Sequence, residues 1–208
     1  MKDLSLHVLE NTAVNGSFMQ LVLDAPAMVP PVPGQFVNVR VSEGEEVILR
    51  RPFSVFRFAG GRLTILYRVI GKGTTALAER RPGDALKVLG PLGTPFPLRE
   101  GPALLVGGGI GIPPVHFLGT VLAAAGSEVT TCLGFRSAGE LMLEESFAGF
   151  SKAVAVATDD GTAGVRGTVL DALVSLPAPA PGTTVYACGP AGMLRALKTW
   201  CGERSLPL

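Results

Sequence analysis

The stretch Ala103-Leu104-Leu105-Val106-Gly107-Gly108-Gly109-Ile110-Gly111-Ile112-Pro113-Pro114 (ALLVGGGIGIPP) decides the fold of the second half of this chain. Its apolar start predicts a short buried strand, its glycines a loop, and Pro114 the first turn of a helix. Such a loop lets the backbone approach a pyrophosphate, while a helix start offers N–H groups and its positive dipole end. Counted from Gly109 the spacing is G-x-G-x-x-P instead of G-x-G-x-x-G. We expect nucleotide binding, although such a loop also occurs as a simple turn.

Downstream of this loop, short apolar runs alternate with segments of helical length. Besides Ala103–Val106, we expect strands at 129–133, 153–157 and 184–187, and helices from about 114 to 125, 140 to 147, 169 to 176 and 191 to 201. Thr168 is the expected N-cap of the third helix. Strands and helices in strict alternation predict a parallel sheet with helices on both faces.

The first half has a different pattern, because its apolar residues alternate with polar ones, as in Leu4–Val8 and Val37–Val41. Gly60-Gly61 separates two such runs and predicts a hairpin turn. Short strands at close spacing favour a small antiparallel β barrel. We therefore expect two domains, a β barrel over residues 1–98 and an α/β domain with a parallel sheet over residues 99–208.

Composition limits the possible partners and compartments. The net charge of +1 gives no sign of a nucleic-acid-binding tract. Cys132, Cys188 and Cys201 lack metal-ligand or disulfide-framework spacing, so we expect no metal site and a reducing cytoplasm. The first residues lack the apolar core of a signal peptide. Residues 101–127 carry no charge and could span a bilayer by length, but glycines and prolines in their middle argue for a soluble core and against a membrane span.

Two further motifs are candidate ligand sites. Arg50-Arg51-Pro52-Phe53-Ser54 places cations, a ring and a hydroxyl side by side, although a solvated arginine pair beside a half-buried strand would look the same. Cys188-Gly189-Pro190 ends the last expected strand, where ligands of open parallel sheets bind. A buried structural cysteine followed by a Gly-Pro turn is an equally good interpretation.

In combination, Arg51–Ser54, Gly107–Pro114 and Cys188–Pro190 resemble the ferredoxin-NADP reductase superfamily, whose members pair a flavin-binding β barrel with a nicotinamide-binding α/β domain. Within that superfamily the chain is most similar to the electron-transfer subunits of type B dihydroorotate dehydrogenase. That similarity rests on Leu49–Ser54, Tyr67–Thr74, Val88–Gly93 and Thr158–Gly161.

The resemblance implies a role for each matching barrel residue. Arg51 would pair with the pyrophosphate of FAD, and Phe53, which follows Pro52, would pack against the flavin or its ribityl chain. Ser54 would hydrogen-bond near flavin N5. The remaining flavin contacts implied are Tyr67, Arg68 and Val69 along the next strand, with Gly73 and Thr74 as N–H and hydroxyl donors to phosphate.

In the α/β domain the resemblance implies that the loop Gly107, Gly108, Gly109, Ile110 and Gly111 cradles the pyrophosphate of NAD. Cys188, Gly189 and Pro190 would lie near the nicotinamide, which makes Ser54 and Cys188 the side chains nearest to the reacting atoms. Hydride transfer is the cofactors' own chemistry, and the protein supplies distance and orientation. His7 and His116, the two histidines, are expected to be surface or packing residues.

The resemblance also implies a cysteine-rich segment that binds a [2Fe-2S] cluster, which needs four thiolates. The three cysteines present are too few and too far apart. A cluster is therefore expected only if the native chain extends beyond Leu208. A trimmed chain, a lost segment and a shorter relative remain open as explanations.

Three functions are weighed. The first is a flavoprotein electron-transfer subunit that oxidises NADH through FAD and passes single electrons to a dihydroorotate dehydrogenase catalytic subunit, in a heterotetramer that makes orotate for pyrimidine biosynthesis. The second is a stand-alone NAD(P)H–flavin or ferredoxin reductase, and the third a nucleotide-binding regulatory or scaffold module without redox turnover. Arg136, near the end of the second α/β strand, points to NADP, whereas the resemblance points to NAD.

Overall fold

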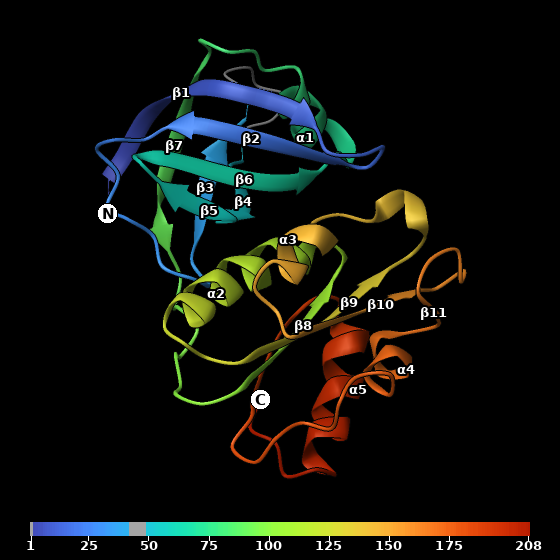
Figure 1. The fold of residues 1–208 in the computed structure, drawn as a ribbon. Helices are drawn as coiled ribbons and strands as arrows, with labels where there is room; N and C mark the ends of the chain where they lie inside the picture. The colour runs from blue at the N-terminus through green and yellow to red at the C-terminus, as the bar shows by residue number, and fades with distance from the viewer. Residues whose placement is uncertain (1, 42–48) are drawn as a thin grey trace. The chain divides into compact units, whose positions relative to one another are not determined.

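The computed structural model describes residues 2–41 and 49–208, which form two compact units that meet in sequence between Phe96 and Pro97 (Figure 1). The first unit is built on an antiparallel sheet and the second on a parallel one. The predicted fold class, an antiparallel β unit followed by a parallel α/β unit, is confirmed.

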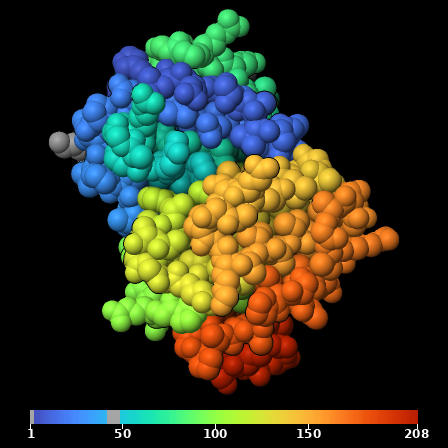
Figure 2. Space-filling model, viewed as in Figure 1, coloured from blue at the N-terminus to red at the C-terminus, as the bar shows by residue number. Residues whose placement is uncertain are grey.

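The first unit contains a sheet of seven antiparallel strands in the order β4-β3-β7-β1-β2-β6-β5. Side chains of β1 alternate, with Leu6 and Val8 buried and Ser5 and His7 exposed, and Figure 2 shows the outer face of β1, dark blue, as part of the molecular surface. The strands are β1 (Lys2–Ala13), β2 (Phe18–Asp24), β3 (Phe36–Arg40), β4 (Arg51–Ser54), β5 (Arg57–Ala59), β6 (Arg62–Arg68) and β7 (Ala85–Leu92).

The two edge strands of this sheet, β4 and β5, follow each other in the chain, and their junction closes the sheet. The Val55 N–H donates to the Gln35 carbonyl at 3.0 Å, which continues the β3–β4 ladder. One residue later, the Phe56 N–H donates to the Thr64 carbonyl at 3.1 Å and the chain begins to pair with β6. One continuous segment thus borders both ends of the sheet, which is how the predicted barrel forms.

The hairpin expected at Gly60-Gly61 joins β5 to β6, with Ala59 paired to Arg62. Both glycines have positive φ angles, 56° and 71°. A two-residue hairpin loop of this type needs left-handed backbone at both positions, which glycine adopts without a steric penalty. The prediction is confirmed.

Helix α1 (Gly71–Ala78) was not predicted, because its Gly-Lys-Gly-Thr-Thr start is poor in helix formers. Tertiary contacts hold its far end. The Asn11 Nδ2 atom donates to the carbonyls of Leu77 at 2.8 Å and Arg80 at 3.0 Å, and the Tyr67 hydroxyl donates to Asn11 Oδ1 at 3.0 Å. The helix is therefore stabilised by β1 and β6 instead of by its own propensity.

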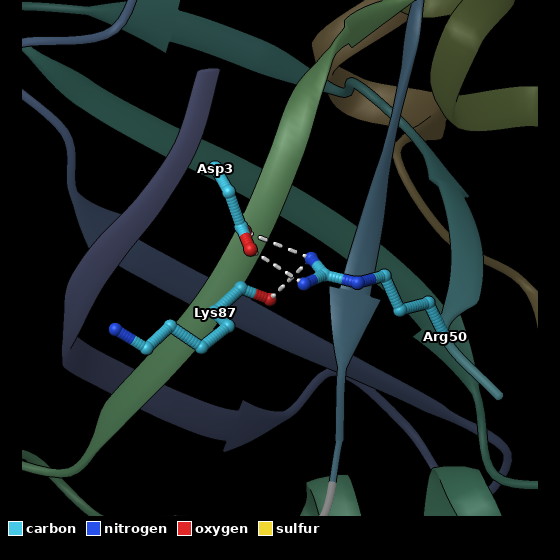
Figure 3. A network of polar contacts seen from close by, with 3 residues as sticks. All are labelled: Asp3, Arg50 and Lys87. Carbon is cyan, nitrogen blue, oxygen red and sulfur yellow. Dashed lines mark hydrogen bonds and ion pairs between the residues drawn. The ribbon is translucent and has the colours of Figure 1, made fainter. Parts of the chain in front are cut away.

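The two arginines that precede Pro52 have different partners. Arg50 is held by Asp3, to which its Nη1 and Nη2 atoms donate at 3.0 and 2.7 Å, and Nη1 also lies 3.5 Å from the Lys87 carbonyl (Figure 3). Successive side chains of an extended chain point to opposite faces, so Arg51 lies on the other face. A solvated pair is therefore ruled out for Arg50, which connects the start of β1 to the entry of β4.

The second unit contains a five-stranded parallel sheet in the order β11-β10-β9-β8-β12. Each of the four expected strands is present and extends one or two residues beyond its predicted end, whereas the two-residue β11 was not predicted. The strands are β8 (Ala103–Gly108), β9 (Val129–Phe135), β10 (Ala153–Thr158), β11 (Val165–Arg166) and β12 (Thr184–Cys188).

Helices cover both faces of this sheet, as predicted (Figure 1). Leu104 and Val106 of β8 share a buried cluster with residues of α4 and α5. Leu105 points the other way, towards α2, where a methyl group on Gly119 would lie 2.7 Å from its Cδ1 atom. The helices are α2 (Ile112–Ala124), α3 (Glu144–Ala148), α4 (Val169–Leu173) and α5 (Ala191–Gly202).

Two predicted helices are shorter than expected. The segment 140–147 is interrupted at Leu143, whose φ of 68° breaks the helical hydrogen-bond ladder, so only a 3₁₀ turn (Ala138–Glu140) and α3 form. Helix α4 ends at Leu173 instead of Leu176. Its N-cap is confirmed, since Thr168 and Asp171 form a reciprocal capping box.

The uncharged segment 101–127 forms β8, a glycine turn and α2, as expected for a buried strand, loop and helix. Across residues 2–41 and 49–208, no helix combines the length and apolar character that a bilayer crossing needs.

The Tyr67–Asn11 bond gives a prediction about stability and pH. We expect Tyr67→Phe to lower the free energy of unfolding by about 1–2 kcal/mol at neutral pH, because it removes the donor to Asn11. Burial raises the pKa of Tyr67 from 10.0 to about 12. Between these values the unfolded chain binds fewer protons than the folded one, so the wild type loses stability as pH rises. The difference between wild type and variant should therefore shrink from pH 10 to 12 in urea unfolding, and a constant difference would contradict this.

Candidate functional site

In the first unit, Arg51 lies against the first turn of α1. A methyl group on Gly73 would be 2.9 Å from Arg51 Nε and 3.5 Å from its Cζ atom. The first N–H groups of a helix have no partner within the helix, and the helix dipole is positive at this end. A guanidinium beside such a helix start is a favourable arrangement for binding a phosphate anion.

The hydroxyl of Thr74 stabilises the start of the same helix. It accepts a hydrogen bond from the Ile70 N–H at 2.6 Å and lies 2.8 Å from the Ile70 carbonyl, to which it donates. To donate to a phosphate, as the sequence suggested, it would have to give up that bond. Gly73, whose N–H precedes the intrahelical ladder, is the better placed donor of the two.

Phe53 and Tyr67 pack inside the barrel. Their ring centroids are 5.8 Å apart in an edge-to-face arrangement, and Tyr67 is only 1% exposed. The Tyr67 ring is in the core and its hydroxyl is bound to Asn11, so the flavin contact expected of Tyr67 would have to come from its backbone. Arg68 is also engaged within the unit, with its Cζ atom 5.5 Å from the centre of the Phe18 ring.

Backbone and apolar groups near Arg51 remain accessible. Strand β5 pairs with Arg62–Thr64, the first part of β6, so the C-terminal part of β6 extends beyond β5. Beyond this end, Val69 and Ile70 are 39% and 69% exposed, and Leu49, whose carbonyl accepts from Arg51 Nη1 at 3.0 Å, is 73% exposed. Pro52 is exposed and Ser54 half-buried. The unit thus offers apolar surface and polar groups next to a phosphate-binding arrangement. Sequence reasoning missed Leu49 and Ile70, because an exposed apolar residue has no pattern of its own.

In the second unit, most glycines of the β8–α2 loop are required by packing. A methyl group on Gly111 would overlap the Cys188 carbonyl and lie 2.7 Å from the Gly189 nitrogen. One on Gly107 would lie 2.9 Å from Ile112 Cγ1, and one on Gly108 would lie 3.0 Å from Pro190 Cδ. Gly108 and Gly111 thus let this segment touch the loop after β12, whereas Gly107 lets the end of β8 lie close to Ile112.

Gly109 is the loop glycine that faces open space. Its φ is +52°, and nothing lies within 4 Å of a methyl group placed on it. Its neighbour Ile110 is 49% exposed. The sequence predicted that the backbone of this loop approaches a ligand closely. Gly109 and Ile110 leave room for such an approach, whereas Gly107, Gly108 and Gly111 are packed against other residues of the protein.

The start of α2 differs from the expectation. A 3₁₀ turn, Gly109–Gly111, precedes the helix, and the Ile112 N–H donates to the Gly109 carbonyl. Pro113 and Pro114 occupy the next two positions and have no N–H. The prediction that the helix start itself presents free N–H groups is therefore wrong. The dipole remains, and the N–H donors available to an anion belong to the 3₁₀ turn.

The carboxyl ends of the parallel strands place four loops along one edge of the sheet. In spatial order, Cys188-Gly189-Pro190 follows β12, the glycine loop follows β8, Arg136 follows β9, and Asp159-Asp160 follows β10. The last two loops are joined, since the Asp159 N–H donates to the Phe135 carbonyl at 3.1 Å and the Asp160 N–H to the Arg136 carbonyl at 3.3 Å. This edge suits an extended nucleotide that crosses several strands.

Other candidate side chains have plainer roles. Burial raises the pKa of the Cys188 thiol, which keeps it neutral beside the glycine loop. His116 is buried, with Nε2 2.6 Å from Ser146 Oγ and its ring 4.9 Å from that of Phe147, and His7 is exposed. The histidines are packing and surface residues, as expected. In the part of the chain that the structure describes, no three His, Cys, Asp or Glu side chains gather to hold a metal ion.

Comparison with known proteins gives clear relatives, although no protein-family model matches the chain. The dihydroorotate dehydrogenase B (NAD(+)), electron transfer subunit of Bacillus caldolyticus is 46% identical over 171 residues, covering 79% of this chain and 65% of the relative. The subunit of the same name from Shouchella clausii (strain KSM-K16) is 39% identical over 210 residues, covering 98% of this chain and 80% of the relative. The chain therefore spans about two thirds of the first relative's length.

A solved structure of an NADH-dependent reduced ferredoxin-NADP oxidoreductase, reported for insights into flavin-based electron bifurcation, is similar in fold. It superposes with a TM-score of 0.82 at 30% sequence identity, and the match covers 93% of this chain and 71% of that one. The similarity to the ferredoxin-NADP reductase superfamily proposed from the motifs is confirmed.

The contact between the two loops can be tested at Gly111. We expect Gly111→Ala to destabilise the protein by about 1–3 kcal/mol or more, because its methyl group meets the backbone of Cys188, which cannot rotate away. Its φ of −79° suits alanine, so backbone strain is not the cause. Gly192→Ala is the matched control, since its methyl group meets nothing within 4 Å. Urea unfolding measures both, and equal stabilities for the two variants would refute the contact.

Proposed function

The chain belongs to the family of electron-transfer subunits of dihydroorotate dehydrogenase B, and from this membership we propose that it is a flavoprotein that oxidises NADH through FAD and passes electrons to a dihydroorotate dehydrogenase catalytic subunit. Its place is in pyrimidine biosynthesis, in the cytoplasm, within a heterotetramer with that subunit. The family supports the partner, while the composition of the assembly is part of the proposal.

The observation that carries the proposal is the contact of Arg51 with Gly73 at the start of α1. Arg51 is half-buried beside the start of α1, where the helix N–H groups and the helix dipole favour an anion, and the pyrophosphate of FAD is such an anion. The exposed apolar surface of Leu49, Val69 and Ile70 lies next to these residues in the chain and suits the faces of a flavin ring. A scaffold module without a cofactor would have no use for this combination.

The roles of the residues follow from these contacts. Arg51 and the Gly73 N–H bind the pyrophosphate, and Ser54, at the barrel corner, hydrogen-bonds near flavin N5. Gly109 and Ile110 present the 3₁₀-turn N–H groups to the pyrophosphate of NADH, and Cys188 to Pro190 border its nicotinamide. These residues would hold and orient FAD, which would supply the redox chemistry between a hydride donor and a one-electron acceptor.

NADH is proposed over NADPH because of the loops after β9 and β10. Arg136 could bind a 2′-phosphate, but two backbone hydrogen bonds hold Asp159 and Asp160 beside it. Asp160 accepts from the Thr162 hydroxyl at 2.6 Å and N–H at 3.0 Å, and these bonds lower its pKa, so it stays ionised. Carboxylates next to the ribose disfavour a 2′-phosphate, and the exposed Asp159 is free to accept from a 2′-hydroxyl.

The cysteines of this chain do not fit a [2Fe-2S] cluster. Cys132 and Cys201 are buried in the core, and Cys188 belongs to the nucleotide edge. A cluster therefore needs ligands from residues beyond Leu208. No electron-transfer step is assigned to such a cluster in this chain.

The function is tested by reducing the purified protein with NADH in the absence of oxygen. We expect a yellow protein whose flavin absorption bleaches faster with NADH than with NADPH, and electron transfer to dihydroorotate dehydrogenase catalytic subunit when the two are mixed. Colourless protein that FAD cannot reconstitute would exclude the redox function. Bleaching followed by rapid reduction of free flavin or ferredoxin, without binding to a catalytic subunit, would instead identify a stand-alone reductase.

Arg51 and Arg50 form a matched pair for testing the FAD site. Arg51→Ala should weaken FAD binding roughly tenfold or more, because each charge-assisted hydrogen bond is worth about 1.5–3 kcal/mol. Arg50→Ala should leave FAD affinity unchanged and cost at most about 1 kcal/mol of stability, because it removes a partly exposed ion pair with Asp3. Fluorescence titration of apoprotein with FAD measures both, and unchanged affinity in Arg51→Ala would refute its assigned role.

A further inference from the structure

Met193 lies between the two loops that the nucleotide edge depends on. A methyl group on Gly108, the last residue of β8, would be 2.6 Å from Met193 Sδ. A methyl group on Gly189, in the loop after β12, would be 2.5 Å from Met193 Cε and 3.0 Å from its Sδ atom. The end of one side chain therefore occupies the space that both glycines leave open.

The rest of Met193 is anchored in the core. It is half-buried near the start of α5 and packs against the cluster formed by Leu104, Val106 and residues of α4 and α5. Methionine is flexible and polarisable, so its thioether fills narrow, irregular spaces well. The side chain thus reaches from the core to the loops and fills the space between them.

The contact at Met193 differs from the one at Gly111. At Gly111, backbone lies against backbone, and this contact brings the two loops together whatever side chains surround it. At Met193, a side chain fills the space beside Gly108 and Gly189. The thioether therefore lies between Gly108 and Gly189, whereas the Gly111 contact brings the two loops together.

We propose that Met193 is a positioning residue for the nicotinamide nucleotide: its thioether holds the loop after β8 and the loop after β12 in one arrangement, so that pyrophosphate and nicotinamide are bound by a single rigid surface. This inference rests on the proposed function and deepens it. Small displacements of a bound reactant reduce the rate of a transfer reaction steeply, so loss of this packing acts on both binding and hydride transfer.

The experiment compares variants at 193 and 189 by anaerobic stopped-flow reduction of bound FAD with NADH, which gives a limiting rate and an apparent Kd. Met193→Ala should lower the ratio of rate to Kd by about tenfold, and Met193→Leu, which conserves volume, should stay within about twofold of wild type. FAD affinity should not change in either variant, because Met193 belongs to the other unit.

A second pair of variants tests the shared space itself. Gly189→Ala should impair NADH binding, because its methyl group needs the space of Met193 Cε. The double variant Gly189→Ala with Met193→Ala should recover part of that loss, since the new methyl group replaces the lost thioether. Gly192→Ala is the control, and it should behave like wild type.

The outcomes separate this inference from the proposed function. Wild-type protein that NADH cannot bleach would overturn the proposed function, and the positioning role with it. Normal wild type with unchanged rate and Kd in Met193→Ala would overturn the positioning role alone. So would losses in the double variant equal to the product of the single losses, or a Met193→Leu variant as impaired as Met193→Ala at equal thermal stability. If Met193→Ala does not fold, Gly189→Ala decides: a rate and a Kd for NADH equal to those of Gly192→Ala would overturn the positioning role.

Discussion

Close backbone approach at two glycines, Gly73 and Gly111, is the constraint on which both candidate sites depend. At Gly73 the missing side chain leaves room for the Arg51 guanidinium against the first turn of α1, and at Gly111 it leaves room for the Cys188 carbonyl. In each unit the proposed phosphate site combines two segments that are distant in sequence. At Gly111 a methyl group would meet backbone atoms, so glycine is required there by packing, whereas at Gly73 a methyl group would meet the Arg51 side chain, which would have to move.

The barrel corner explains why one arginine of the pair is free for a ligand. The chain pairs with β3 up to Val55 and with β6 from Phe56 onwards. Because side chains alternate along this segment, Arg50 reaches Asp3 over the outer face, while Arg51 reaches the start of α1. The Arg50–Asp3 ion pair and the proposed anion site at Arg51 are thus two results of one strand geometry.

Periodic features of the fold could be predicted from sequence, and features that arise from tertiary contacts could not. Period-two runs, the Gly60-Gly61 turn and the strand–helix alternation specify the two sheets through local rules. Helix α1 escaped prediction because Asn11, sixty or more residues earlier, holds its end. The motif residues Arg51 and Gly73 were predicted as ligands separately, but their contact is visible only in the fold. Tyr67 was named as a flavin contact from the family resemblance, which does not reveal that its ring lies in the core.

In the second unit, the proposed pyrophosphate site depends more on the arrangement of two loops than on the N–H groups of a helix start. Two prolines and a 3₁₀ bond remove the donors that a nucleotide-binding helix start usually offers. What remains is the helix dipole, which acts on an anion without fixing its orientation, and the N–H groups of a single turn, which do fix it. That turn is held by contacts of Gly108 and Gly111 with the loop after β12. Orientation of a bound pyrophosphate therefore depends on how firmly the two loops are packed, and this is the property that the Met193 thioether controls.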